Sequence, residues 1–294
     1  MFNTIISHDR IKKQLTRDIA SLSYHQAYLF AGPEHVGKMS LLQEFISQIR
    51  TGKAFDKNSS LGKQILAGQG EGLLAFLDNG ESLKVEEIRK LSDFVSMRTA
   101  TGQISFCIIE HLERMSKSAA NAFLKILEEP SERFVYLMTT REERKLLPTI
   151  RSRVQFYRFT TIPSGELKKY LHEQLGNEVK IQEILKLAAG KIGLAVAMLR
   201  DQALLDRMRE LYDFAAVLFE DDLVDRFTLA EHLSGEDFSA PDLQQFLVYL
   251  ALRLKQQGSR RYLRQLGRVQ DTRRLFKDTQ VNKRMQLEGL FLEI

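Results

Sequence analysis

The stretch LFAGPEHVGKMS has the glycines and the lysine of a phosphate-binding loop. Gly32, Gly37 and Lys38 follow the spacing G-x-x-x-x-G-K between an apolar run and a helical pattern. Backbone N–H groups of such a loop bind phosphate oxygens, and the lysine neutralises their charge. The next position, where a hydroxyl would hold magnesium, is Met39, and a thioether is a poor ligand for this hard ion. The loop therefore either binds a nucleotide (ATP or ADP) in degenerate form or survives as a structural remnant.

The apolar run FCIIEHLERM stands where a nucleotide-hydrolysing site would have an Asp-Glu pair. In such a pair the aspartate supports magnesium and the glutamate activates the attacking water. Glu110 and His111 occupy these two positions. Glu110 could approach a metal ion and a histidine can act as a base near neutral pH, but a histidine held by ordinary packing at a strand end is the commoner case. With Met39 also in place, intrinsic hydrolysis is not expected.

Composition places the chain among ordinary globular proteins. It has 294 residues, of which 44% are hydrophobic and 28% charged. A single cysteine, Cys107, excludes an internal disulfide and any cysteine-rich zinc site. The sequence has no apolar run of the roughly 18–20 residues that a membrane span needs, and its start lacks the pattern of a signal peptide. We therefore expect a cytoplasmic protein without membrane contact.

Charge is distributed unevenly in the last third of the chain. Residues 206–242 contain 11 acidic and 3 basic residues, a net charge of −8, whereas residues 253–284 contain 11 basic and 2 acidic residues, a net charge of +9. Solvated faces of amphipathic helices are the simplest interpretation. Complementary surfaces for partner subunits or for DNA remain open.

The order of apolar runs predicts which elements must position these residues. Four strand-like runs alternate with helical patterns in the first 160 residues, which indicates α/β layering around a mostly parallel sheet. The runs lie at 26–32, 70–80, 104–110 and 134–140, and the helical patterns at 39–49, 82–95 and 117–130, the last ending at Pro130. Beyond residue 160 nearly everything is helical, with breaks at 176–177, 189–193, 234–242 and 256–259.

Five segments between residue 8 and residue 294 form a specific combination. They are HDRIKKQL with HQAYLFAGPEHVGK, AANAFLKILEEP, LLPTIRSR, AAGKIGLAVAML and NKRMQLEGLFLEI. Together they resemble the delta-prime subunit family of the bacterial DNA polymerase III clamp loader, within the AAA+ superfamily. The resemblance implies an α/β AAA+ P-loop domain with a parallel sheet at 1–160, a small helical lid domain at 161–205 and an all-α collar domain at 206–294.

The resemblance also implies an arginine finger. In this family and its ATPase relatives, a Ser-Arg-Cys motif places an arginine in the ATP site of the neighbouring subunit. The matching residues are Ser152, Arg153 and Val154, so the cysteine is lost but the arginine is present. A guanidinium suits the role, because it is permanently charged and its planar donors match phosphate oxygens. Without the resemblance, an exposed salt bridge would be the simpler interpretation.

Two sensor positions follow from the same resemblance. Thr139, or its neighbour Thr140, matches the first sensor, which reports the γ-phosphate in the family. The second sensor is an arginine of the lid in catalytic relatives, and Gly193 stands at its position. Several family members carry a four-cysteine zinc module between residues matching 50 and 72, and this chain has no cysteine there. No zinc or other metal is therefore expected.

These features imply a non-hydrolysing subunit of the clamp loader within the DNA polymerase III holoenzyme, a nucleotidyltransferase complex. It would help to load the sliding clamp onto primer-template DNA during replication, with the ATPase and clamp-opening subunits as partners. One alternative is the ATP-hydrolysing motor subunit of the same loader, which ATP turnover by the isolated chain would support. Another is a free-standing DNA-binding protein that uses residues 253–284, and this alternative predicts DNA affinity that falls steeply with salt.

Overall fold

A computed structural model describes residues 1–2, 4–96, 103–129, 131, 133–219, 222–257, 262–276 and 281–294. The chain divides into two compact units, Met1–Val196 and Ala197–Ile294, and each is considered by itself. Pro130, the predicted end of a helix, lies outside the described residues, as do residues 258–259 of the last predicted break.

The first unit contains a six-stranded sheet in the order β2-β3-β4-β5-β1-β6. All neighbouring strands are parallel except the short β2, which pairs antiparallel with β3. Every residue of β1, β4 and β5 is buried, as expected for central strands of a parallel sheet that is covered on both faces. The strands are β1 (Ala27–Ala31), β2 (Gln69–Gly70), β3 (Leu73–Phe76), β4 (Ser105–Ile109), β5 (Phe134–Thr140) and β6 (Gln155–Arg158).

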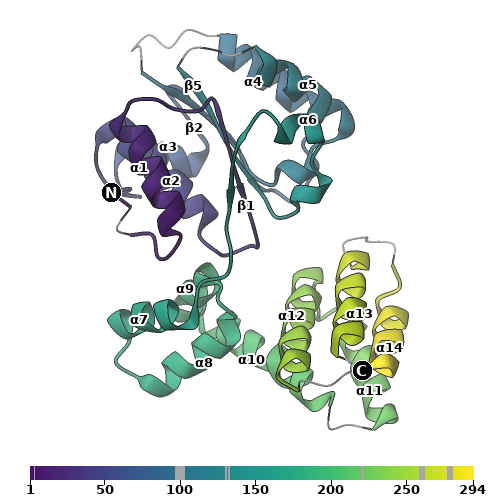
Figure 1. Cartoon of the computed structure of the whole chain (residues 1–294). Coiled ribbons are helices and arrows are strands. Elements are labelled where there is room, and N and C mark those ends of the chain that lie inside the picture. Colours follow the sequence, from purple (N-terminus) through teal and green to yellow (C-terminus); the bar gives the residue numbers. More distant parts are fainter. Residues whose placement is uncertain are drawn as a thin grey trace. The chain divides into compact units, whose positions relative to one another are not determined.

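Helices cover the two faces of this sheet in separate layers (Figure 1). One layer contains α1 (Asp9–Ala20), α2 (Lys38–Thr51) and α3 (Ser60–Ala67), and its core includes Leu15, Leu41 and Phe45. The other contains α4 (Val85–Ser96), α5 (Lys117–Glu128) and α6 (Pro148–Arg151), and its core includes Leu91, Phe123 and Ile150. These apolar positions recur at helical spacing, so each helix buries one stripe against the sheet.

The remainder of the described chain is helical. The first unit continues with α7 (Ser164–Gln174), α8 (Glu178–Ala188) and the start of α9 (Ile192–Arg200). The second unit follows with α10 (Gln202–Val217), α11 (Leu223–Ser234), α12 (Ala240–Gln257), α13 (Tyr262–Leu275) and α14 (Lys283–Glu293). In it α12 packs against both α10 and α13, and α11 packs against α14. Among the helices described, none combines the length and the apolar character needed to cross a bilayer.

The four predicted strands and the helical patterns between them are confirmed, as is the mostly parallel sheet. The strand β6 and the helices α1, α3 and α6 were not predicted. Some boundaries differ: α12 begins at Ala240, inside the predicted break at 234–242, and α9 and α10 are separated at Asp201, where no break was predicted. The division into three domains at residues 161 and 206 stays a prediction.

Candidate functional site

The sheet order brings the predicted nucleotide-site residues to one edge. Strands β4, β5 and β1 are neighbours, and in parallel strands the carboxyl ends meet at the same edge. The glycine loop follows β1, Glu110 and His111 follow β4, and Thr139 lies near the end of β5. These residues therefore share a site, although they come from three distant parts of the sequence.

The glycines of the loop are required by its backbone. Gly32 has φ of 153°, and a Cβ there would lie 2.4 Å from the carbonyl oxygen of Phe159. Gly37 has φ of 96° and precedes the first residue of α2. The Gly32 amide also donates to the carbonyl of Thr140 at 3.0 Å, which fixes the loop to β5.

The Lys38 ammonium is turned back onto its own loop. Its Nζ donates to the carbonyl oxygens of Gly32 at 2.6 Å and Pro33 at 2.5 Å, and the residue is only 7% exposed. Burial disfavours the charged form and lowers the pKa of Lys38 to about 8. The charge is held by neutral acceptors, which a phosphate group could replace as a stronger partner.

The start of α2 suits phosphate better than it suits magnesium. The amides of Gly37, Lys38 and Met39 have no hydrogen-bond acceptor within the described part of the chain, as is usual for the first turn of a helix. Met39, in contrast, packs its side chain against the buried cluster between α2 and the sheet. The loop thus keeps donors for phosphate oxygens, while the position for a metal-binding hydroxyl holds a partly buried thioether that packs against the core.

His111 is fixed at the end of β4 by its surroundings. It is 7% exposed, with φ of 53°, and its amide donates to Oγ1 of Thr139 at 3.1 Å. Its Nε2 lies 3.3 Å from Oδ2 of Asp78, and its Nδ1 lies 3.4 Å from Oε1 of Glu113 without hydrogen-bond geometry. Glu110 accepts a hydrogen bond from the Asp78 amide at 3.0 Å. Both predicted residues are thus engaged by the chain itself.

Glu113 is the central acid of this site, and sequence reasoning missed it. Its side chain is 4% exposed and accepts from Thr140 Oγ1 at 2.6 Å, while Nε of Arg141 lies 3.3 Å from its Oε1. Burial alone would raise its pKa, but contacts from His111, Thr140 and Arg141 outweigh burial and lower the pKa of Glu113 to about 2. Arg141 also pairs with Glu34 of the glycine loop. The only clue in the sequence is a glutamate in the turn after β4.

Gly193 lies against the glycine loop. Its amide, at the start of α9, donates to the carbonyl of His35 at 2.7 Å. A Cβ at Gly193 would lie 3.1 Å from both Cα and O of His35. An arginine, the residue expected here in a catalytic relative, would therefore require the loop or the helix to shift by a few tenths of an ångström.

Ser152 and Arg153 lie just after α6 and are exposed. Ser152 Oγ donates to the carbonyl of Thr149 at 3.0 Å. Arg153 donates from Nη1 to the same carbonyl at 3.0 Å, and its Nη2 lies 2.7 Å from Oε1 of Glu128. All of these partners belong to α5 and α6, so the two residues form a feature separate from the glycine loop.

Within the described ranges, the structure has no cluster of three or more His, Cys, Asp or Glu side chains arranged to hold a metal ion. Cys107 is fully buried in β4, and burial raises the pKa of its thiol well above the usual range. A buried thiol of this kind packs as a small apolar side chain.

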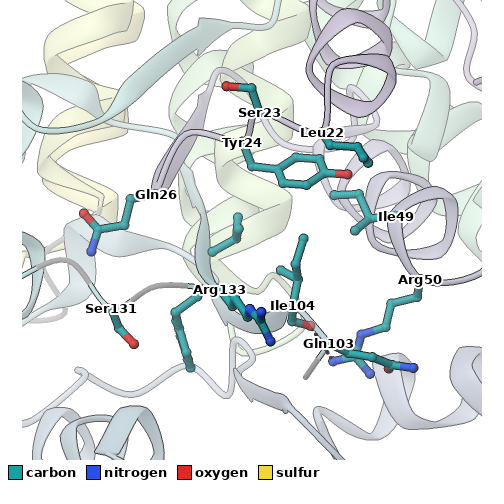
Figure 2. Close-up of a pocket in the computed structure, with 12 residues that line it drawn as sticks. Leu22, Ser23, Tyr24, Gln26, Ile49, Arg50, Gln103, Ile104, Ser131 and Arg133 are labelled. Atoms are coloured by element: carbon teal, nitrogen blue, oxygen red, sulfur yellow. Dashed lines mark hydrogen bonds between the residues drawn. The ribbon is translucent and has the colours of Figure 1, made fainter. Parts of the chain in front are cut away.

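A cavity of about 1040 Å³ lies at the opposite edge of the sheet, at the amino ends of β1, β4 and β5. Figure 2 shows Leu22 and Tyr24 along the upper side of the view, with Gln103 and Ser131 along the lower side. Its lining includes Arg50, whose guanidinium donates to the carbonyls of residues 71, 72 and 104. None of the predicted site residues lines this cavity.

The family described as "DNA polymerase III, delta subunit" matches residues 7–163, which is more than half of the chain. The tau subunit of DNA polymerase III from Bacillus subtilis is 31% identical over 213 residues, covering 69% of this chain and 38% of that protein. The delta-prime subunit from Pseudomonas aeruginosa is 34% identical over 133 residues, covering 43% of this chain and 40% of that protein. The chain thus spans well under half the length of these curated relatives.

Solved structures share the fold at low sequence identity. A DNA polymerase III gamma-subunit-related protein from Thermotoga maritima matches with a TM-score of 0.55 and 17% identity, covering 95% of this chain and 97% of that one. A RuvB variant from the same organism matches with a TM-score of 0.53 and 14% identity, covering 84% and 88%. These likenesses confirm the α/β P-loop fold with its helical continuation. By the family match, the chain belongs to the DNA polymerase III delta-subunit family, a group of clamp-loader subunits of the AAA+ type.

Proposed function

We propose that this chain is a non-hydrolysing, delta-prime-like subunit of a clamp loader, and that it donates Arg153 to the ATP site of a neighbouring subunit. The main support for the proposal is the pair of residues that follows β4. At the two positions where a hydrolytic site needs an aspartate and a glutamate, the chain has Glu110, which accepts from the Asp78 amide, and a buried His111. With Met39 packed against the core in place of a hydroxyl residue, neither the metal nor the attacking water has its usual protein group.

The exposure of Arg153 supports a role in trans. An arginine finger must reach beyond its own subunit, and the Arg153 side chain is 37% exposed at the end of a short helix. In related phosphoryl-transfer systems an arginine finger accelerates the reaction by about 10³–10⁵-fold, because it stabilises the charge of the transition state. Ser152, which caps α6, would fix the backbone that carries the arginine.

The partners follow from this role. The chain would assemble in the cytoplasm with the ATPase and clamp-opening subunits of DNA polymerase III and would reach the sliding clamp and primer-template DNA through that complex. In the proposal the glycine loop keeps its shape for packing, and any nucleotide held by its amides and Lys38 is not hydrolysed.

A second candidate is the ATP-hydrolysing motor subunit of the same loader. The observation in its favour is the likeness to the tau subunit of Bacillus subtilis over 69% of this chain. The two candidates differ in one measurable property, because a motor subunit hydrolyses ATP and the proposed subunit does not. The isolated chain should therefore show no ATP turnover above a buffer control, and clear turnover would favour the motor.

The test of the main proposal is clamp- and DNA-stimulated ATP turnover in a reconstituted loader that contains wild-type chain or Arg153→Ala. We expect turnover to fall by at least about tenfold, since one of the ATP sites in the assembly loses its finger. Arg151→Ala is the matched control, because Arg151 is an exposed arginine two residues away with no side-chain partner among the residues that the structure describes.

Assembly of each complex is verified by gel filtration before the rates are compared. A fall with Arg153→Ala alone supports the finger. Equal rates for wild type and both variants would reject it and leave the chain as a scaffold.

A further inference from the structure

Glu128 is the only acidic side chain that the described structure pairs with Arg153. Its Oε1 lies 2.7 Å from Nη2 of Arg153. Glu128 is the last residue of α5, whereas Arg153 follows α6, so the contact joins two separate elements. Glu128 is the last residue of the segment AANAFLKILE, and Arg153 is the last residue of the segment LLPTIRSR.

The backbone on both sides of this contact is anchored. Leu127, beside Glu128, is 6% exposed, and Ile150, three residues before Arg153, is 1% exposed. Both belong to the same buried cluster below α5 and α6. Ser116 caps the start of α5 by accepting from the Ala119 amide at 3.1 Å. The carboxylate and the arginine therefore project from fixed positions.

The contacts leave part of the guanidinium available. Nη1 donates to the Thr149 carbonyl at 3.0 Å and approaches Ser152 Oγ at 3.4 Å, and Nη2 meets Glu128. The Nη2 contact with Glu128 is an ion pair without hydrogen-bond geometry, so the N–H donors of Nε and Nη2 have no hydrogen-bond acceptor in the part of the chain that is described. Nε and Nη2 form one edge of the guanidinium, and two donors on one edge suit a pair of phosphate oxygens.

We propose that Glu128 is a positioning residue for Arg153, and this inference rests on the proposed function. An exposed arginine otherwise samples many rotamers, with about 2 kcal/mol of rotamer entropy to lose. A group that stabilises a transition state is effective only when it is held in place beforehand. Glu128 and Thr149 hold the guanidinium from one side and keep the remaining donors directed outward.

The ion pair between Glu128 and Arg153 contributes little to folding stability. A loss of activity without a loss of stability would therefore indicate a positioning role rather than a structural one. The side chains of Arg153 and Glu128 are 37% and 51% exposed, and ion pairs at such exposure rarely stabilise a protein by more than about 1 kcal/mol. Removing the carboxylate should leave the thermal midpoint and the assembly of the complex unchanged while the arginine becomes mobile.

The experiment compares Glu128→Gln with Glu129→Gln in the reconstituted loader. Glu129 is the adjacent exposed glutamate, and its side chain has no ion-pair partner among the described residues, so both variants remove one charge at the same surface. We expect Glu128→Gln to lower kcat for stimulated ATP turnover by roughly three- to tenfold with KM for ATP unchanged, because a misplaced group loses transition-state stabilisation. Glu129→Gln should match wild type.

Arg153→Ala and the double variant Arg153→Ala/Glu128→Gln complete a double-mutant cycle. If Glu128 acts through the arginine, the second substitution adds nothing in the Arg153→Ala background. An additional loss in that background, or a rate for Glu128→Gln equal to or above wild type, would overturn the inference. If Arg153→Ala itself has no effect, the proposed finger fails; if only Glu128→Gln has no effect, the finger stands and the positioning role fails.

Discussion

Glu113 is a buried acid at the centre of the predicted nucleotide site. Its carboxylate is buried and accepts from Thr140 and from the Arg141 amide, and the His111 ring lies against it. The acid therefore stabilises the fold where β4 and β5 end.

Replacing Glu113 by glutamine should destabilise the protein in a pH-dependent way. The pKa of Glu113 in the fold is about 2, below its ordinary value of 4.5, so the carboxylate stabilises the folded state fully above about pH 4.5 and loses this effect as the pH falls toward 2. We expect Glu113→Gln to lower the free energy of unfolding by about 2–3 kcal/mol at pH 7, measured by urea denaturation. The difference from wild type should narrow between pH 5 and pH 3.

Glu173→Gln serves as the control, since Glu173 is exposed on α7 and has no side-chain partner in the described structure. It should follow wild type at every pH. A Glu113→Gln variant as stable as wild type at pH 7 would show that the carboxylate is dispensable for folding.

Local spacing predicted some residues of this site and could not predict others. Gly32, Gly37 and Lys38 were found because a phosphate loop is a contiguous pattern. Glu113 and Thr140 are 27 residues apart, and their contact exists only because β4 and β5 are neighbours in the sheet. Strand order is a property of the whole sheet, so no short sequence pattern predicts a contact between two such residues.

At the scale of elements, the start of α9 determines how closely the helical segment approaches the glycine loop. The Gly193 amide reaches the His35 carbonyl because Gly193 has no side chain to keep the two backbones apart. His35 itself has φ of 61°, so its backbone has little freedom to yield.

Gly193→Ala should therefore loosen this contact. The added Cβ would lie 3.1 Å from Cα and O of His35, and relieving such crowding typically costs about 1–3 kcal/mol. Hydrogen exchange should become faster at the start of α9, where the amide of residue 193 donates to the His35 carbonyl, and the thermal midpoint should fall. Gly165→Ala, at a helical glycine with no atom within 4 Å of its Cβ position, should leave exchange there unchanged. Unchanged exchange in Gly193→Ala would mean that the contact is not maintained in solution.

The strands differed in how clearly the sequence predicted them. β1, β4 and β5 are buried throughout, so each is a continuous apolar run and was predicted. β6 has only Tyr157 buried and follows the arginine-rich segment after α6, so its apolar pattern is weak. It is a strand because it pairs with β1, Leu29 opposite Phe156, and this pairing depends on the whole sheet.

At the scale of the whole molecule, the two charged stretches lie in the second unit, and some of their side chains form ion pairs with each other or with the C-terminal helix α14. Arg284 contacts Glu231 of the acidic stretch at 3.1 Å and Glu288 at 2.7 Å, and Arg268 contacts Glu293 at 2.8 Å. Each exposed pair contributes little to stability, but together they reduce the positive field that DNA would meet. Residues 258–261 and 277–280 of the basic stretch lie outside the described residues.

The isolated chain should accordingly bind primer-template DNA only weakly. Fluorescence anisotropy at about 150 mM salt should show no saturation below about 10 µM chain, within the usual range of non-specific binding. The matched variants are Arg264→Gln, which removes an exposed arginine without a described partner, and Arg268→Gln, which removes a paired one. Neither should change the salt dependence appreciably, because few phosphate contacts form. Sub-micromolar binding that weakens steeply with salt, with a slope reduced by Arg264→Gln, would instead support a DNA-binding surface in residues 253–284 that acts without partner subunits.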